Sequence, residues 1–582
     1  MVSDRWITDS VRWERLPYYT RANAGEVLPD PASPLGWTLV FEQGLLKGWL
    51  RGFIEFGVYR PGELPDDPPP VAGLFGGYFY LNLSHMRLMG LRMGQTVEQF
   101  DAAFLGPHPD KPPYELHPDD ACEECSAKIG QTIGQILTAS SFPDIDADHE
   151  RVRRLRRQRP QLAAMSDAEL VAHARSFLPE LDNAFAKHDY SSLASTVGQA
   201  MLSELAGYLG RPDALLELIS GLGDVESASP SWGLWELSRI VAGSAELTAL
   251  FDRGTHLVAA ALTGPRTGEL QRFGAAFDRF VEDYGMRGPN EWDIRARSWE
   301  VDPVQALAHV DSLRRTSDDN SPDTRAERLR ARREAVAEEF RVALAGDPEK
   351  LQTLETALRS AALTIPLREK TKANAATVIN EVRVTIRELG RRGVADGRFA
   401  EPEDVMMLLA AELDGYLAGP DSFIAVIAER LRAYQELFDL EPPFIIAREL
   451  RPLTQWPRRS RTGPAPAAAA GDLLHGIGGS AGSFTGRVRV VNDLDQADAL
   501  EPGEVLVAPI TDAAWTPLFL VAGAVVVNMG SLNSHAVVVS RELGIPCVLS
   551  VTDATRRLAD GSQVTVDGSD GTVSVHAVPA PV

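Results

Sequence analysis

The spacing of apolar residues changes once along this chain, near Gly476, and that change restricts the fold to two kinds of structure in series. After Gly476, apolar and polar residues alternate in short runs separated by glycine and aspartate, which is the pattern of β-strands. Before about residue 450, apolar residues recur at helical spacing, as in Met165–Phe177, where Ser166 and Glu169 match a capping box. We therefore expect a multidomain protein with a large, mostly helical part followed by a small β/α domain.

The sequence predicts three segments, because 582 residues exceed what one hydrophobic core can organise. Residues 1–451 form the helical part, with a further helix expected around 323–345 and a long acidic loop or a partial subdomain at 110–148. Residues 452–472 are rich in proline and alanine without amphipathic spacing, which is typical of a linker. Residues 473–582 form the β/α domain.

Charge and composition exclude several classes of partner. The net charge is −23, so the surface repels nucleic acid and anionic membranes. The sequence has no run of about 18 apolar residues, and its polar N-terminus lacks a signal-peptide core. Three cysteines are too few for a disulfide framework. We expect a cytoplasmic protein that binds neither nucleic acid nor a membrane.

One histidine in the β/α domain has the surroundings of a phosphoryl carrier. Gly523–Asn528 predicts a strand, Met529–Asn533 a short loop and Ser534–Leu543 a helix, which puts His535 in a first helical turn. Amide groups there lack helical partners and the helix dipole is positive, so a phosphoryl group on the imidazole meets an anion site. Imidazole is also a good nucleophile near neutral pH. On position alone, a structural histidine remains the alternative.

The string from Gly530 to Val548, followed by DATRRLADGSQVTVDGSDGTV, closely resembles the mobile phosphohistidine domain of the phosphoenolpyruvate (PEP)-utilising enzymes. GGSAGSFTGRVRVV and GEVLVAPITDAAWTPLF resemble the opening of that domain and the strand and loop before its histidine. The resemblance covers essentially all of residues 473–577. It implies that His535 carries a phosphoryl group as a catalytic intermediate on a small swivelling β/β/α domain.

The resemblance also implies roles for residues beside the histidine. Thr511 and Trp515 lie in the loop that shapes the site in this type of domain, and Ser534 directly precedes the histidine. Two positions depart from the family: Ser531 replaces the second of two glycines, and Asn533 stands where leucine or threonine is more common. Ser531 is a candidate helix cap and Asn533 a candidate donor to phosphate. The alternative is a slowed or inactive site.

The helical part contains strings that resemble the acceptor-binding domain of the rifampin phosphotransferases, in the order that family uses. They are YYTRANAGEVLPDPASPLGWTL, GGYFYLNLSHM, VEDYGMRGPNEWDIRARSWEVDP, LREKTKANA and ELGRRGVADGRFAEPEDVMMLL, spread over residues 15–450. Met286 departs from the pattern, because relatives commonly carry a histidine there, so a base at that position is absent. The resemblance implies a small hydroxylated organic acceptor.

Phosphoryl transfer depends on charge stabilisation and positioning, which selects candidate residues from these strings. Arginine suits phosphoryl oxygens because it makes bidentate contacts, and a carboxylate can take the proton of the acceptor. The candidates for phosphoryl binding are Arg21, Arg287 and Arg368, and those for the base are Glu26, Glu291 and Glu369. The candidates for contacting the acceptor are Asn23, Trp37, Trp292 and Trp299. Structural ion pairs and core packing are the alternatives.

The domain inventory best resembles the phosphohistidine subunit of the phenylphosphate synthases. That resemblance implies a separate ATP-grasp subunit that holds ATP and Mg²⁺, so we expect no cofactor bound directly to this chain. No Walker A motif is present, and GIGGSAG at Gly476–Gly482 precedes a strand instead of a helix, which argues against nucleotide binding. The competing interpretations are a catalytically silent regulatory or scaffold homologue and half of an antibiotic-inactivating phosphotransferase.

Cys122 and Cys125 form a CxxC pair with His117 nearby. A zinc site needs four ligands, and no fourth ligand stands at a typical spacing. We expect two ordinary thiols in a loop or at a helix start, and no metal ligands on this chain.

Overall fold

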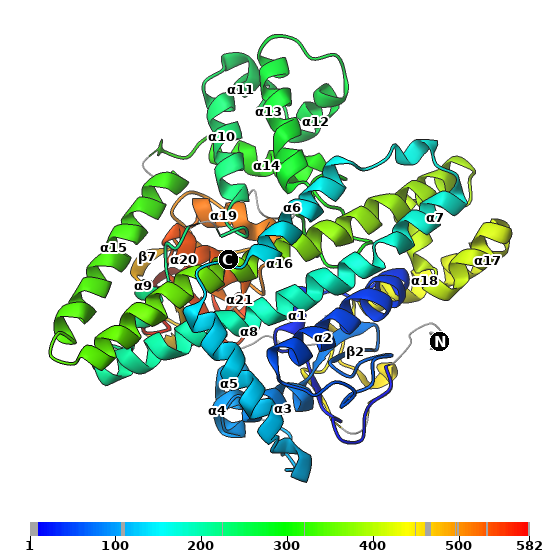
Figure 1. Cartoon of the computed structure of the whole chain (residues 1–582). Helices are drawn as coiled ribbons and strands as arrows, with labels where there is room; N and C mark the ends of the chain where they lie inside the picture. The colour runs from blue at the N-terminus through cyan, green and yellow to red at the C-terminus, as the bar shows by residue number, and fades with distance from the viewer. Residues whose placement is uncertain are drawn as a thin grey trace. The chain divides into compact units, whose positions relative to one another are not determined.

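The computed structural model describes residues 10–105, 111–223, 225–318, 321–447, 450–459, 467–494, 496, 500–530 and 534–579. Most of these residues are helical, and a small β/α domain lies at the C-terminal end of the chain, as the sequence predicts (Figure 1). Contacts divide the chain into two compact units. Unit 1 comprises Met1–Ala194, Asn290–Ala296 and Thr371–Gly463, and unit 2 comprises Ser195–Pro289, Arg297–Lys370 and Pro464–Val582. The long helices α8 (Leu178–Tyr208) and α16 (Pro348–Ala395) contribute residues to both units.

Unit 1 contains a small antiparallel sheet. Its strand order is β2 (Ala72–Phe75), β3 (Tyr78–Asn82), β1 (Tyr19–Thr20) and β4 (Ile445–Ile446). Tyr19 of β1 lies opposite Asn82 on one side and Ile446 on the other, so the sheet joins segments from both ends of the helical part. The apolar spacing does not predict this sheet, because two of its strands have only two residues each.

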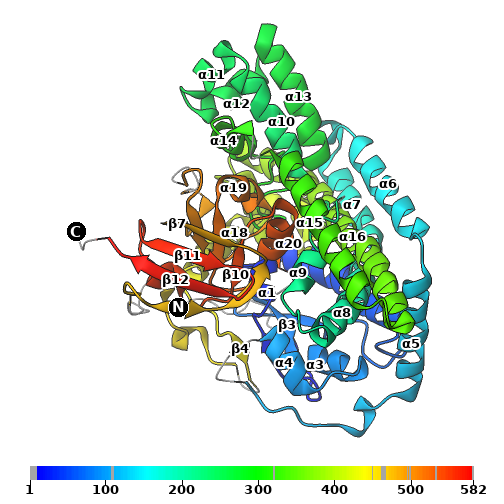
Figure 2. The same ribbon diagram turned by 90° about the vertical axis from the view of Figure 1, so that its left-hand side faces the viewer.

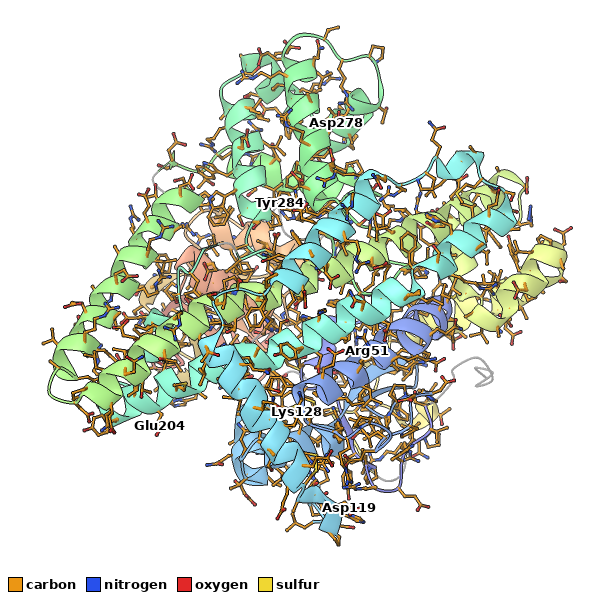
Figure 3. All side chains as sticks on the ribbon, in the orientation of Figure 1. Arg51, Asp119, Lys128, Glu204, Asp278 and Tyr284 are labelled. Carbon is orange, nitrogen blue, oxygen red and sulfur yellow. A yellow bond between two sulfur atoms is a disulfide. The ribbon has the colours of Figure 1, made fainter. Side chains whose placement is uncertain are left out.

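The helices of unit 1 begin at a side-chain cap in some cases and without one in others. They include α1 (Ala24–Val27), the π-helical η1 (Gly36–Leu45), α2 (Leu46–Phe56), α3 (Leu83–Arg92), α4 (Val97–Phe104), α7 (Asp167–Ser176), α17 (Leu413–Ala418) and α18 (Ile424–Leu437). The predicted capping box of α7 is confirmed, because Ser166 Oγ accepts the amide of Glu169 and the Glu169 carboxylate accepts the amide of Ser166. Figure 3 shows Arg51 on α2, where it pairs with Asp182 of α8 at 2.7 Å. Within the described ranges, no helix is both long and apolar enough to cross a bilayer.

Of the two alternatives predicted for 110–148, the long acidic loop is wrong. The described part of that stretch has a 3₁₀ turn, η2 (Pro118–Asp120), and two helices, α5 (Glu123–Thr138) and α6 (Pro143–Arg157); Figure 3 labels Asp119 and Lys128 there. The buried residues of α5 recur every three or four positions and therefore share one face: Cys125, Ile129, Thr132 and Ile136. The helical signal is present, but glycines and exposed polar residues between these positions dilute it.

The helices that lie wholly in unit 2 include α9 (Ala214–Leu218), α10 (Pro230–Ala242), α11 (Ala245–Phe251), α12 (Thr255–Thr263), α13 (Gly268–Tyr284), α14 (Pro303–Leu313) and α15 (Pro322–Ala343). Helix α15 confirms the helix predicted around 323–345. Helices α9 and α15 share an apolar cluster with α8 and α16, whereas α10 to α14 pack around another. The cluster of α10 to α14 joins Leu237 of α10 and Val310 of α14 to Phe519 and Val537 of the β/α domain. The β/α domain is therefore docked on these helices within unit 2.

The β/α domain is built on an eight-stranded sheet. Its order is β5 (Leu473–His475), β12 (Thr572–Ala577), β11 (Gln563–Asp567), β7 (Ser483–Val490), β8 (Val505–Ala508), β9 (Ala524–Val527), β10 (Cys547–Leu549) and β6 (Ile477–Ser480). Neighbours from β7 to β10 are parallel, whereas the other pairs are antiparallel. The connecting helices are α19 (Thr516–Val521), α20 (His535–Leu543) and α21 (Ala554–Arg557). Figure 2 shows α20 beside β10. The alternating runs predict β7 to β12, but of the three helices only α20.

Candidate active site

His535 is the first residue of α20, which follows β9 and a short loop. Ser534 is the N-cap, with φ −69° and ψ 160°, and Gly544 ends the helix in the left-handed region at φ 65°. The first amides of a helix have no intrahelical acceptors, and the helix dipole is positive at that end. The histidine thus stands in the first helical turn that its sequence predicts, where an anion attached to the ring would be stabilised.

Two threonine hydroxyls hold the imidazole ring through its two nitrogens. Thr511 Oγ1 lies 3.1 Å from Nδ1, and Thr516 Oγ1 lies 2.9 Å from Nε2. The ring of Phe519 packs edge-on against the imidazole at 5.8 Å between centroids, and only 6% of His535 is exposed. A neutral imidazole has one N–H and one lone pair, so one hydroxyl accepts and the other donates. The ring is therefore held in a defined orientation, and rotation of one hydroxyl frees the nucleophilic lone pair.

Ser534, the residue before His535, is buried, and its hydroxyl has no hydrogen-bond partner among the described residues. A Cβ atom on Gly530 would lie 3.3 Å from Ser534 Oγ and 3.0 Å from Leu549 Cδ2, so a side chain at position 530 would press on this hydroxyl. A buried hydroxyl left unpaired costs about 1–3 kcal/mol, and each such group in a native fold needs an explanation. A phosphoryl oxygen on the adjacent histidine is an acceptor that fits.

The other residues predicted beside the histidine divide into two groups. Trp515 is 6% exposed and packs into the apolar cluster that docks the domain. Ser531 and Asn533 lie outside the described residues, so their roles stay predictions.

Sequence reasoning misses Thr516, although it stands in the same string as Thr511. A 3₁₀ turn at Ala513–Trp515 separates the two threonines, whose hydroxyls meet the same ring.

Arg21 lies in unit 1 next to β1, and main-chain acceptors surround its guanidinium. It donates to the carbonyl oxygens of Phe79 at 2.7 Å, Leu28 at 3.0 Å and Pro29 at 3.1 Å. Burial lowers the pKa of Arg21 below its ordinary value. These contacts tie β3 to the residues that follow α1. Phosphoryl binding by Arg21 stays a prediction.

Three predicted acceptor-site residues with polar side chains also belong to unit 1. Asn23 precedes α1 with a φ of 59°, and Glu26 lies in the first turn of that helix. Glu291 is 3% exposed, and its carbonyl oxygen accepts a hydrogen bond from Arg383 Nη2 at 2.5 Å. Their roles toward an acceptor stay predictions.

The three predicted pocket tryptophans are buried in the two cores. In unit 1, Trp37 stacks on Phe41 at 5.3 Å and Trp292 packs edge-on against Phe185 at 5.8 Å. In unit 2, Trp299 is fully buried in the apolar cluster. Core packing therefore describes the present environment of all three side chains, and a contact with an acceptor stays a prediction.

Arg287, Arg368 and Glu369 belong to unit 2, as does His535. Glu369 is 1% exposed, forms an ion pair with Arg368 and accepts a hydrogen bond from Ser227 Oγ. Arg287 is also 1% exposed, and its carbonyl oxygen accepts the amide of Trp299 at 2.7 Å. Of the predicted charged residues, the structure thus brings Arg368 and Glu369 together as a largely buried pair.

The expectation of two ordinary thiols at Cys122 and Cys125 is wrong, because the structure joins them in a disulfide. Cys122 is the N-cap of α5, so the Cα atoms lie 5.2 Å apart across the first helical turn, a separation that a disulfide spans. His117 caps the η2 turn, where its Nδ1 accepts the amide of Asp119 at 3.2 Å. Over the part of the chain that the structure describes, no three His, Cys, Asp or Glu side chains gather in a geometry that would hold a metal.

Two family models match the chain where the sequence resemblance predicts them. Residues 500–571 match the PEP-utilising enzyme mobile domain, which includes His535, Thr511 and Thr516. The predicted resemblance to the PEP-utilising family is confirmed. Residues 188–369 match the rifampicin phosphotransferase fourth domain, which includes α10 to α15 and the Arg368–Glu369 pair.

Several curated proteins are similar to the chain over part of their length. The chain is 28% identical to the prodigiosin synthesizing transferase PigC of Serratia marcescens, over 70% of this chain and 45% of that protein. It is 28% identical to the rifampicin phosphotransferase of Streptomyces sviceus over 52% and 34%, and 41% identical to the PEP synthase of Aeropyrum pernix over 24% and 18%. The chain spans less than half the length of each of these relatives. The similarity is therefore to phosphotransferases of the PEP-utilising type as a class.

Proposed function

We propose that this chain is a phosphotransferase subunit that carries a phosphoryl group on His535 and passes it to a hydroxyl of a small organic acceptor. The held imidazole supports this most strongly: His535 opens α20, and its two ring nitrogens contact Thr511 and Thr516. The similarity to PEP-utilising phosphotransferases supports the same reaction class.

In the first step, the lone pair of one imidazole nitrogen attacks a phosphorus atom of ATP. The P–N bond forms as the P–O bond to the leaving phosphate breaks, and the electron pair of that bond leaves with the oxygen. The other ring nitrogen keeps its proton and donates it to its threonine oxygen, which stabilises the positive charge that develops on the ring. The amides at the start of α20 and the Ser534 hydroxyl then receive the phosphoryl oxygens.

In the second step, the acceptor oxygen attacks the phosphorus atom and the P–N bond breaks, so the electron pair returns to the imidazole nitrogen. The acceptor proton passes to a base. Glu369 is the best supported of the three predicted carboxylates, because it shares unit 2 with His535 and pairs with Arg368. Arg368 in turn suits the phosphoryl oxygens.

A separate ATP-grasp subunit loads His535 in this proposal and holds both ATP and Mg²⁺. The resemblance of the two domains to the phosphohistidine subunit of the phenylphosphate synthases supports that division. The acceptor is an alcohol or phenol. An antibiotic-like molecule is a second acceptor class, which the similarity to a rifampicin phosphotransferase and to a prodigiosin synthesizing transferase favours.

The test is to incubate the purified chain with its ATP-grasp partner and phosphorus-labelled ATP, and to locate the label by peptide mass spectrometry. We expect acid-labile phosphate on His535 and none in a His535→Ala variant. Addition of the acceptor should then discharge the label from His535. A partner that phosphorylates another carrier but leaves His535 unlabelled would support the silent regulatory or scaffold alternative, for which the Ser531 departure is the main argument.

A further inference from the structure

The disulfide between Cys122 and Cys125 lies in the first turn of α5, a helix of 16 residues. Cys122 is the N-cap and is half-buried, whereas Cys125 is only 2% exposed. The amide of Cys125 donates to Cys122 Sγ at 3.1 Å. Amides and the positive end of the dipole at a helix start stabilise a thiolate. The pair therefore has one accessible sulfur, that of Cys122, and a thiolate on it would be stabilised.

The disulfide contributes little as a covalent staple. It closes a loop of only four residues, so it restricts the unfolded chain less than a long-range bridge does. The turn directly before it, η2, is already held by two arginines. Arg92 donates to the carbonyl oxygen of Asp119 at 2.8 Å, and Arg15 forms an ion pair with Asp120 at 3.1 Å. The backbone that leads into Cys122 is thus held by contacts other than the S–S bond.

The backbone after Cys125 is held as well, because α5 packs against α2. Gly57 ends α2 with a φ of 108°. A Cβ atom on Gly57 would lie 2.6 Å from Lys128 Cγ and 3.0 Å from the amide nitrogen of Ile129, so the two helices approach closely there. With both flanks held, the two sulfurs stay near each other after their bond breaks, and the dithiol can close again. Such a pair suits reversible exchange of its bond.

Carboxylates are concentrated around the accessible sulfur. Residues 119–125 contain no Lys, Arg or His and four carboxylates: Asp119, Asp120, Glu123 and Glu124. Asp120 is buried, and the other three are exposed. The exposed cation Lys128, which Figure 3 labels together with Asp119, lies about one turn beyond Cys125. Local negative charge of this kind repels anionic reagents and attracts cationic ones.

We propose that Cys122 and Cys125 form a thiol–disulfide exchange site whose partner is a thiol without negative charge. The partner thiolate attacks Cys122 Sγ, a mixed disulfide forms, and the Cys125 sulfur leaves with the electron pair of the broken S–S bond and takes up a proton. A second partner thiolate attacks the partner's sulfur in the mixed disulfide, and Cys122 leaves as a thiolate. Two thiols are thereby oxidised to one disulfide, and the protein pair gains two electrons. The site is independent of the proposed function of His535.

The first experiment identifies the sulfur that exchanges. The intact Cys125→Ala and Cys122→Ala chains are each incubated with 2-hydroxyethyl disulfide, and peptide mass spectrometry locates the adduct. We expect a mixed disulfide on Cys122 in Cys125→Ala and none on the buried Cys125 in Cys122→Ala, while both chains stay folded by circular dichroism. No adduct on Cys122, or equal adducts in the two variants, would overturn the proposal.

The second experiment uses the wild-type chain, so it does not depend on the folding of a cysteine variant. Three thiols on one two-carbon frame open the disulfide: 2-mercaptoethylamine, 2-mercaptoethanol and 2-mercaptoethanesulfonate. Alkylation of Cys122 reads the opening rate, which is divided by the thiolate concentration of each reagent. At low ionic strength we expect the cationic thiol to react about fivefold faster than the anionic one, and about 1 M salt should remove the difference.

A charge variant tests the selectivity directly. The double variant Glu123→Gln, Glu124→Gln should reduce the ratio of the cationic to the anionic rate about twofold. Glu436→Gln, which changes an exposed carboxylate on α18, is the matched control and should leave the ratio unchanged. A disulfide that stays closed with all three thiols, or that opens at equal rates with them, would contradict the proposal.

Discussion

Thr516 Oγ1 lies 2.9 Å from Nε2 of His535, and this contact completes a set in which both nitrogens of one imidazole meet a hydroxyl, the other being Thr511 at 3.1 Å from Nδ1. A ring bound in this way cannot flip without losing both hydrogen bonds. Its orientation is thus set in advance, which in the proposed function reduces the reorganisation that phosphoryl transfer requires.

Removal of the Thr516 hydroxyl should therefore affect the rate of His535 phosphorylation more than the free energy of unfolding. We expect Thr516→Val to lower the rate of His535 phosphorylation about tenfold, the equivalent of roughly 1.4 kcal/mol in activation free energy. Thr516→Ser keeps the hydroxyl and should retain most of the rate. Labelled phosphate on His535, followed over time, measures both variants. Equal losses in the valine and serine variants would show that shape, not the hydroxyl, matters at this position.

Ser534→Ala should shorten the lifetime of the phosphohistidine without lowering the free energy of unfolding. The Ser534 hydroxyl makes no cap hydrogen bond to α20, so alanine should leave the free energy of unfolding unchanged or raise it by up to about 1 kcal/mol. The phosphorylated form should lose its phosphate faster, because one donor to the phosphoryl oxygens is gone. Ser166→Ala is the matched control: that serine does cap α7, and its removal should cost about 1 kcal/mol. Urea unfolding and the half-life of the phosphohistidine are the two measurements.

His309 should make the stability of the chain depend on pH. Its pKa is lowered from 6.5 to about 4 by burial, so the unfolded chain binds a proton that the folded chain does not between those values. Stability contributed by the neutral ring is full above pH 6.5, falls as the pH is lowered, and stops falling below about pH 4. The expected loss between neutral pH and about pH 5 is on the order of 2 kcal/mol. In His309→Gln, this contribution to the pH dependence of the free energy of unfolding should be absent. Urea unfolding at several pH values measures it, and an equal pH dependence in the variant and the wild type would contradict the prediction.

The disulfide between Cys122 and Cys125 should respond to reductant with little effect on the fold. It closes a loop of only four residues, so reduction should change the free energy of unfolding by less than about 2 kcal/mol. Alkylation of the native chain followed by mass spectrometry should label the half-buried Cys122 only after reduction. Cys125 and Cys547 are buried, and both should remain unlabelled until the chain unfolds. A label on Cys122 without reductant would contradict the disulfide.

Features encoded by neighbouring residues could be predicted from the sequence. The alternating runs predict β7 to β12, the Ser166–Glu169 box predicts the start of α7, and the strand, loop and helix around His535 place it in a first helical turn. Features that depend on distant residues could not. The pairing of Tyr19 with Ile446 joins strands from the two ends of the helical part, and no local periodicity records it.

The sequence by itself was enough to predict the carrier, because His535 stands at a helix start in a string whose adjacent residues match a known domain type. Only the tertiary structure decided what holds that histidine. Thr516 and Glu369 acquire their partners His535 and Ser227 through packing, because a hydrogen bond needs two atoms within about 3 Å. That proximity follows from the close packing of helices against the sheet, which brings together residues that no spacing along the chain connects.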